Sequence, residues 1–275
     1  MSPHGDADLV EVRAALLDAL EALADHRGSV VVIGAQAIYL HTGEVTLALA
    51  ESTYDSDLAL DPRTLTDQPL VEQAMASAGF GPNPITRQPG AWVNARGIPV
   101  DLMVPEALAG PSASQRRGGR IPPHDRTATR RARGLEAAVV DRSQMVITAL
   151  GAGDPRSFTA SVAGPAALLV AKLHKLGERQ DAPDRRVDKD AYDTYRLLAA
   201  IATDALAEAM ANLLQDVLPA PVTRQALIYL EQMFATPIAM GSVMAGRAEE
   251  GIGQPDTVAA AVSTLAGDLL AAVRS

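Results

Sequence analysis

The stretch between Ser29 and Asp61 constrains the fold of this chain more than any other. It opens with Ser29-Val-Val-Val-Ile33, a short apolar and β-branched run that stops at Gly34. A run of this kind that ends at glycine predicts a buried strand followed by a tight turn. Residues 53–60 then read Thr-Tyr-Asp-Ser-Asp-Leu-Ala-Leu and predict a second strand. The front of the chain is therefore expected to build a sheet.

The second strand carries two acids, Asp55 and Asp57. Successive side chains of a strand alternate between its faces, so these two carboxylates point to the same side. They lie roughly 6.5 Å apart along the strand and repel by about 2.5 kcal/mol at an effective dielectric constant of 20. A cation between them would remove this repulsion. A hard divalent ion such as Mg²⁺ or Mn²⁺, which prefers oxygen ligands, is the candidate.

A third acid stands in the apolar run from Ile98 to Val104. An acid in such a run is expected to be paired or coordinated, because burying a bare carboxylate is costly. If this strand lies beside the strand of Asp55 and Asp57, then Asp101 completes a cluster of three carboxylates. Residues 94–97 predict a hairpin turn that leads into this strand. Pro99 argues for an edge strand, or for pairing that begins after the proline.

This order of elements resembles the nucleotidyltransferase fold that is shared with polymerase β. The resemblance rests on Gly34-Ala35 and on the acids Asp55, Asp57 and Asp101. It implies an α+β fold with a mixed sheet, and transfer of a nucleoside monophosphate from an NTP to a hydroxyl. The three acids would bind Mg²⁺ or Mn²⁺, and Asp101 would be a second-metal ligand or a general base. Backbone N–H groups at Gly34 and Ala35 would hold phosphate, and Gln36 would add a side-chain contact.

Composition excludes several other classes. The 275 residues include no cysteine, which excludes disulfides, zinc–thiolate sites and cysteine nucleophiles. The formal net charge of −9 argues against a protein that coats nucleic acid over its whole surface. Neither a signal peptide nor an apolar run long enough to span a bilayer is recognised. We therefore expect a cytoplasmic protein without a membrane partner.

The second half of the chain has helical periodicity throughout. We predict a nucleotidyltransferase domain over residues 1–155 and an all-helical domain over residues 156–275, with a change of pattern near residues 152–162. The predicted helices of the second half span residues 165–179, 188–202, 204–218, 223–234 and 257–274.

Two of these helices carry charges at helical spacing. Lys172, Lys175 and Arg179 share one helix face, and Asp190 and Asp193 share a face near the start of the next helix. Ordinary surface ion pairs, worth under about 1 kcal/mol each, would explain this pattern. A phosphate-binding site would explain it too.

The pattern from Leu169 to Asp193, with residues 51–58 before it, looks like the AbiEii-type nucleotidyltransferases. These are the toxins of abortive-infection and related toxin–antitoxin systems. The resemblance covers roughly residues 28–200. It implies that Asp55 and Asp57 hold the metal, that Lys172 contacts the nucleotide phosphates with Lys175 nearby, and that Asp190 completes the pocket. The chain departs from the family at Ala35, where the family has serine or glycine, and at Glu51, where it has arginine.

An arginine-rich segment runs from Pro105 to Gly134. It contains Arg116, Arg117, Arg120, Arg126, Arg130, Arg131 and Arg133. It reads either as a mobile solvated linker or as an electrostatic funnel for RNA or triphosphate. With the family resemblance, it suggests the 3′ end of an RNA such as tRNA as acceptor, and a cognate antitoxin as partner. Two alternatives stay open: a non-catalytic nucleotide-binding member, and a transferase that modifies a small molecule of the antibiotic type.

Overall fold

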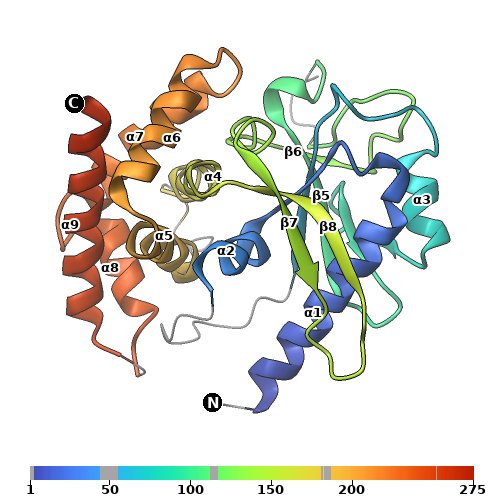
Figure 1. The fold of residues 1–275 in the computed structure, drawn as a ribbon, viewed down its shortest axis with the longest axis horizontal. Helices are drawn as coiled ribbons and strands as arrows, with labels where there is room; N and C mark the ends of the chain where they lie inside the picture. Colours follow the sequence, from blue (N-terminus) through green and yellow to red (C-terminus); the bar gives the residue numbers. More distant parts are fainter. Residues whose placement is uncertain (1–2, 44–54, 112–116, 181, 183–186, 252) are drawn as a thin grey trace. The chain divides into compact units, whose positions relative to one another are not determined.

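The computed structural model describes residues 3–43, 55–111, 117–180, 182, 187–251 and 253–275. The chain forms two compact units (Figure 1). Unit 1 comprises residues 1–37 and 52–163, and unit 2 comprises residues 38–51 and 164–275. The predicted division at residues 155/156 falls just before the last strand of unit 1.

Unit 1 is built on a mixed sheet, which has eight strands in the described residues. Its strand order is β3-β4-β5-β2-β1-β8-β7, and β6 pairs with the outer side of β5 beyond the end of β4. The strands are β1 (Val30–Ile33), β2 (Ser56–Leu60), β3 (Gly81–Pro82), β4 (Ala91–Val93), β5 (Pro99–Pro105), β6 (Arg130–Ala132), β7 (Arg142–Thr148) and β8 (Ser157–Ala163). The predicted α+β fold with a mixed sheet is confirmed.

The helix α1 (Pro3–Ala22) covers the middle of this sheet and contacts β2, β5 and β8 (Figure 1). Its apolar residues at helical spacing are all buried: Val12, Leu16 and Leu20, with Leu23 just beyond the helix. All four residues of β1 are buried as well. β1 lies between two neighbouring strands and beneath a helix, so a continuous run of apolar residues is expected in it.

The hairpin predicted at residues 94–97 joins β4 and β5 as antiparallel neighbours. The Ile98 amide donates to Asn94 Oδ1 at 3.0 Å, and Gly97 has a φ of +80°, which glycine adopts without strain. The edge position considered for this strand is wrong, because β5 pairs with β4 on one side and β2 on the other. Pro99 is tolerated there because it is the first residue of the strand.

Three strands of the described sheet, β3, β6 and β8, were not predicted. The longest of them, β8 (Ser157–Ala163), lies where only a change of pattern near residues 152–162 was expected. This segment, β8, pairs antiparallel with β7 and parallel with β1. Its small and polar residues Thr159, Ala160 and Ser161 lack the apolar alternation that indicates a strand.

Unit 2 is helical in its described residues. It contains α4 (Pro165–Gly177), α5 (Asp188–Ala200), α6 (Thr203–Gln215), α7 (Ala220–Phe234), α8 (Met240–Arg247) and α9 (Pro255–Arg274), and α2 (Gly34–Thr42) begins in unit 1 and continues into it. In unit 1, α3 (Val71–Ser77) and the short turns η1 (Ala24–His26) and η2 (Glu106–Leu108) complete the structure. The five helices predicted for the second half are found within a few residues, and α8 was missed.

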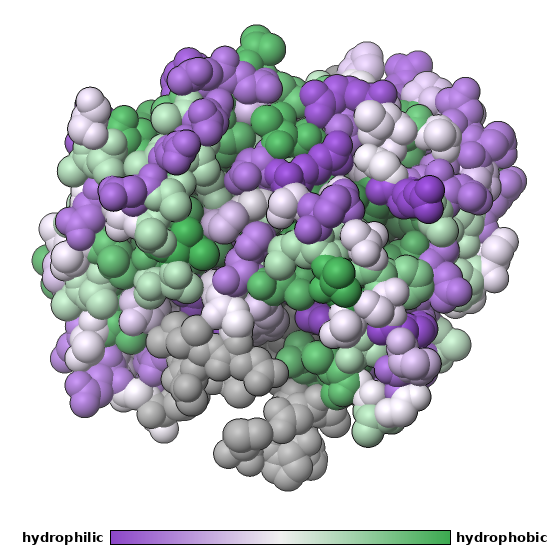
Figure 2. Space-filling model, viewed as in Figure 1, coloured by the Kyte–Doolittle hydropathy of each residue, from purple (hydrophilic) through white to green (hydrophobic). Residues whose placement is uncertain are grey.

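The last helix corrects the expectation that no stretch is apolar and long enough for a bilayer. By length and composition α9 passes that test, with a mean hydropathy of 1.4. It packs on α5, α6, α7 and α8 through a stripe that includes Val258, Val262, Ala266 and Leu269. The helices of unit 2 in Figure 2 carry hydrophilic side chains among hydrophobic ones. A core helix passes the same test, so this feature is weak support for a membrane span.

Candidate functional site

The turn after β1 brings the first acid strand against a glycine. β1 ends at Ile33, and α2 begins at Gly34 with a φ of +68°. Ile33 is paired with Asp57 in the antiparallel register of β1 and β2. A Cβ at residue 34 would overlap the carboxylate of Asp57. Glycine is therefore required twice, for its backbone conformation and for the space that the carboxylate occupies.

Asp57 and Asp101 face each other across neighbouring strands. β2 and β5 are parallel, and their register pairs Asp57 with Asp101, so both side chains lie on the same face of the sheet. The two acid-bearing strands are thus neighbours, which is the condition under which Asp101 was expected to join the acids of β2. With strands about 4.8 Å apart, two such carboxylates repel by about 3.5 kcal/mol at an effective dielectric constant of 20. We call this pair the acid row.

The third predicted ligand lies outside the strand. Asp55 directly precedes β2 and is exposed. Within the described part of the chain, no group of three His, Cys, Asp or Glu side chains is close enough to hold a metal ion. The acid row itself offers hard carboxylate oxygens on one face, which is the donor type that Mg²⁺ takes. The residues fit a divalent cation at Asp57 and Asp101, and a metal role for all three acids remains a prediction.

The acid row already has one cationic neighbour. Arg130, from β6, donates from Nη2 to Asp101 Oδ2 at 2.6 Å and from Nη1 to Gln88 Oε1 at 3.1 Å. The two charged side chains keep 24% and 17% of their surface exposed. β6 brings Arg130 here because it pairs with β5 in a register that places Arg130 opposite Met103, two residues beyond Asp101. Sequence reasoning missed this pair, because 29 residues separate its members.

Gln36, predicted to touch phosphate, faces the interior. It is 1% exposed, and its Oε1 accepts a hydrogen bond from Arg13 Nε at 2.8 Å. Arg13 is itself buried, and burial lowers the pKa of its guanidinium. A second bond from Arg13 Nη1 to the Thr148 carbonyl oxygen joins α1 to the end of β7. In this structure Gln36 holds α2 to α1.

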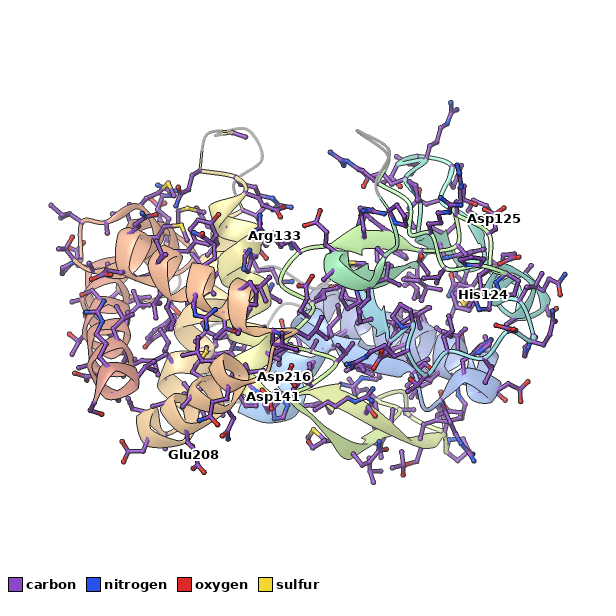
Figure 3. The ribbon with its side chains drawn as sticks, turned by 90° about the horizontal axis from the view of Figure 1, so that it is seen from above. His124, Asp125, Arg133, Asp141, Glu208 and Asp216 are labelled. Carbon is purple, nitrogen blue, oxygen red and sulfur yellow. The ribbon has the colours of Figure 1, made fainter. Side chains whose placement is uncertain are left out.

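The described part of the arginine-rich segment is packed within unit 1, unlike the mobile linker considered from the sequence. Ile121, Ala128 and Thr129 are buried. The Val71 amide donates to His124 Nδ1 at 3.2 Å, which ties the segment to the start of α3 next to Asp125 (Figure 3).

The arginines of this segment divide into two groups. Arg130 binds Asp101, and Arg131 donates to the carbonyl oxygens of Ala109 and Gly110 at 2.9 and 3.2 Å. Four arginines are exposed: Arg117, Arg120, Arg126 and Arg133, the last labelled in Figure 3. Arg116 lies outside the described residues, as do Glu51, Thr53 and Tyr54 of the acid-strand motif. Among the described arginines of this segment, the four exposed ones can meet a polyanion without breaking the contacts of Arg130 and Arg131.

In unit 2 the predicted charges of α4 and α5 meet in one cluster, which we call the helix ion cluster. Lys172 Nζ lies 2.8 Å from Asp190 Oδ1 and 2.7 Å from Asp193 Oδ2. Asp190 also receives Lys175 at 3.0 Å and Arg179 at 3.2 Å. The cluster is not the set of surface ion pairs that the simplest interpretation expected, because the side chains of Lys172, Asp190 and Asp193 are only 9%, 3% and 2% exposed.

Burial and charge act in opposite directions on this cluster. Burial lowers the pKa of Lys172, but the negative charges of Asp190 and Asp193 outweigh it, and the net pKa lies above the usual value. Burial raises the pKa of Asp190, but Lys172 and Lys175 outweigh it, and the net pKa lies below the usual value. Lys172 and Asp190 therefore keep their charges although they are buried. Lys175, 47% exposed, is the most accessible cation of the three.

The chain is similar to a known protein family over most of its length. Residues 11–219 match the model of a protein family described as nucleotidyltransferase. The match spans most of the chain, including the acid row and the helix ion cluster, and the chain therefore belongs to this nucleotidyltransferase family. No curated protein and no solved structure gives a significant match.

Proposed function

We propose that this protein transfers a nucleoside monophosphate from an NTP to an acceptor hydroxyl and releases pyrophosphate, with Mg²⁺ or Mn²⁺ as cofactor. One observation carries the proposal: Asp57 and Asp101 are in register on neighbouring strands, beside a glycine turn that makes room for Asp57. It occurs in a chain that belongs to a nucleotidyltransferase family.

Each residue of the site has a proposed task. Asp57 and Asp101 would hold the cation, together with Asp55, which precedes Asp57 by two residues. A bound cation would neutralise the triphosphate and stabilise the in-line displacement. Asp101, as the alternative general base, would take the proton of the attacking hydroxyl while the bond to pyrophosphate breaks. The first N–H groups of α2, at Gly34 and Ala35, lack partners within the helix and would face anionic oxygens.

The resemblance assigns the nucleotide phosphates to Lys172, with Lys175 and Asp190 in the pocket. The contacts of the helix ion cluster favour a refinement. Lys172 is buried between two carboxylates, and moving it onto a phosphate would leave the buried Asp193 without its ammonium and Asp190 with Lys175 and Arg179 alone. Lys175 is half exposed and bonded to one carboxylate. We therefore propose Lys175 as the phosphate contact and Lys172 as the residue that holds Asp190 in place.

Pyrophosphate release tests the activity. The wild-type protein should release pyrophosphate from at least one NTP in the presence of Mg²⁺ and total RNA, and Asp57→Asn should abolish the release. Asp67→Asn, an exposed acid outside the acid row, is the matched control and should behave as wild type. Metal-dependent NTP binding without release would favour the non-catalytic alternative. If the protein neither binds an NTP nor releases pyrophosphate, the proposal is refuted.

For the acceptor we propose an RNA 3′ end, as the AbiEii-type resemblance suggests with tRNA as first candidate. The exposed arginines of the arginine-rich segment support this choice because the rest of the chain is acidic. Total RNA incubated with α-labelled NTPs should give a discrete labelled band that weakens steeply with salt.

A matched pair of variants tests the role of the exposed arginines. Replacing Arg117, Arg120, Arg126 and Arg133 together by glutamine should reduce RNA labelling and leave NTP binding intact. Arg27→Gln, an exposed arginine outside the segment, should leave labelling unchanged. Label on a small molecule instead of RNA would refute the acceptor and favour the antibiotic-type alternative.

A toxin role and a cognate antitoxin belong to the same proposal. Expression in a bacterial host should arrest growth, and Asp57→Asn should relieve the arrest. Growth arrest by both forms alike would show that the arrest does not depend on nucleotidyl transfer and would contradict the toxin role.

A further inference from the structure

Arg130 stands out among the charged residues of unit 1 because it occupies a carboxylate of the acid row. Its Nη2 lies 2.6 Å from Asp101 Oδ2, slightly shorter than most charge-assisted hydrogen bonds between nitrogen and oxygen. Its Nη1 is held by Gln88 at 3.1 Å, and its Nη2 also lies 3.4 Å from Met103 Sδ. Contacts on both sides of the guanidinium fix it over Asp101.

Charge balance shows what this contact does to the acid row. Asp57 and Asp101 carry two negative charges, and Arg130 returns one positive charge. A divalent cation that approaches Asp101 then meets a guanidinium that already lies on one of its oxygens and offsets part of the negative charge of the row. The triphosphate of an NTP brings several further negative charges, enough to hold both cations at once.

We infer that Arg130 is the counter-ion of the acid row in the absence of metal, and that it makes metal binding there depend on the nucleotide. This inference rests on the proposed function. Free Mg²⁺ or Mn²⁺ competes with Arg130 for Asp101 and binds weakly, whereas the metal–triphosphate complex supplies the charge that offsets the guanidinium. Arg130 is thus a positioning residue that acts through Asp101.

Mn²⁺ binding tests the inference directly, because free Mn²⁺ is counted by its electron paramagnetic resonance signal. Titrations are run with Mn²⁺ alone and with Mn²⁺ plus a methylene analogue of ATP that cannot transfer its nucleotide. Arg130→Gln should raise the affinity for Mn²⁺ alone by about tenfold, since one positive charge has left the site. The affinity for the Mn²⁺–analogue complex should change by a smaller factor.

Three matched variants separate charge from structure. Arg130→Lys keeps the positive charge and should bind Mn²⁺ alone as weakly as wild type. Gln88→Ala removes the second anchor but leaves the charge, and should do the same. Arg126→Gln removes an exposed arginine of the same segment and should have no effect. A melting curve for each variant verifies that it is folded.

The outcomes distinguish this inference from the proposed function. An unchanged or lower affinity of Arg130→Gln for Mn²⁺ alone, in a protein whose wild type binds the Mn²⁺–analogue complex, overturns the role of Arg130 and spares the function. No Mn²⁺ binding by any variant, with or without the analogue, overturns the proposed metal site and the role of Arg130 with it. Tighter binding of Mn²⁺ alone in Arg130→Gln only, with Arg126→Gln as wild type, supports the inference.

Discussion

The acid row of unit 1 and the helix ion cluster of unit 2 combine the same chemical groups under different conditions. In the acid row, Asp101 is 17% exposed and meets one arginine. In the helix ion cluster, Lys172 is enclosed with two carboxylates that are 3% and 2% exposed. A buried charge must keep its partners, because losing one leaves the other without solvent. We therefore propose that the partly exposed acid row can exchange Arg130 for another cation. The buried helix ion cluster instead contributes to the stability of the fold.

The largest effect is expected in the acid row, on activity and not on folding. Asp57→Asn removes a charged oxygen from the proposed cation site, and nucleotidyl transfer should fall by about a thousandfold or more, because both binding of the cation and stabilisation of the transition-state charge are weakened. The melting temperature should stay equal or rise slightly, because the repulsion within the row is relieved. A variant that keeps its transfer rate would remove the row from the site.

The second effect is expected in the helix ion cluster and on folding. Lys172→Met keeps the side-chain length but leaves Asp190 and Asp193 without their shared ammonium, and the free energy of unfolding should fall by about 3–5 kcal/mol. The Lys175 side chain is 47% exposed, so Lys175→Met should lower the free energy of unfolding by at most about 1 kcal/mol. Its loss in the free energy of NTP binding should be larger than that. Urea unfolding measures the stability of both variants. Equal losses of stability would contradict the contrast between a buried and an accessible lysine.

The glycine turn should show a smaller loss. Gly34→Ala places a Cβ on the Asp57 carboxylate and in a left-handed backbone conformation, and should destabilise the protein by about 1–3 kcal/mol. Gly28→Ala, with nothing within 4 Å of its Cβ, is the matched control and should stay within about 0.5 kcal/mol of wild type. If both variants unfold alike in urea, the close approach of Asp57 does not constrain the turn.

The last effect is of similar size and concerns acid pH. The pKa of Asp190 is lowered in the folded protein, so its contribution to stability is present above the unfolded pKa of about 3.9 and is lost as the pH falls toward the folded pKa. Wild type should lose on the order of 2 kcal/mol more than Asp190→Asn between pH 6 and acid conditions. Parallel stability curves for the two proteins would show that Asp190 does not gain from Lys172 and Lys175.

The sequence predicted the parts of this molecule that local pattern determines. The apolar run of β1, the alternation around Asp57 and the helical spacing of α4 and α5 gave the elements. A cluster of Asp57 with Asp101 was expected only on the condition that β2 and β5 are neighbours. The pairing of Arg130 with Asp101 depends on how β6 lies beside β5, which no periodicity encodes. Likewise Gln36 turned inward because Arg13, distant in sequence, reaches it. Contacts between distant residues were therefore the part that sequence could not supply.

Calorimetric titration of a Mg²⁺–NTP complex tests the central claim, that the acid row is the cation and nucleotide site of this nucleotidyltransferase. We predict that the wild-type protein binds the complex and that Asp55→Asn/Asp57→Asn weakens binding at least about a hundredfold, or about 2.7 kcal/mol, with an unchanged melting temperature. Asp67→Asn should bind as wild type. Equal binding by the wild type and the double variant would contradict the account.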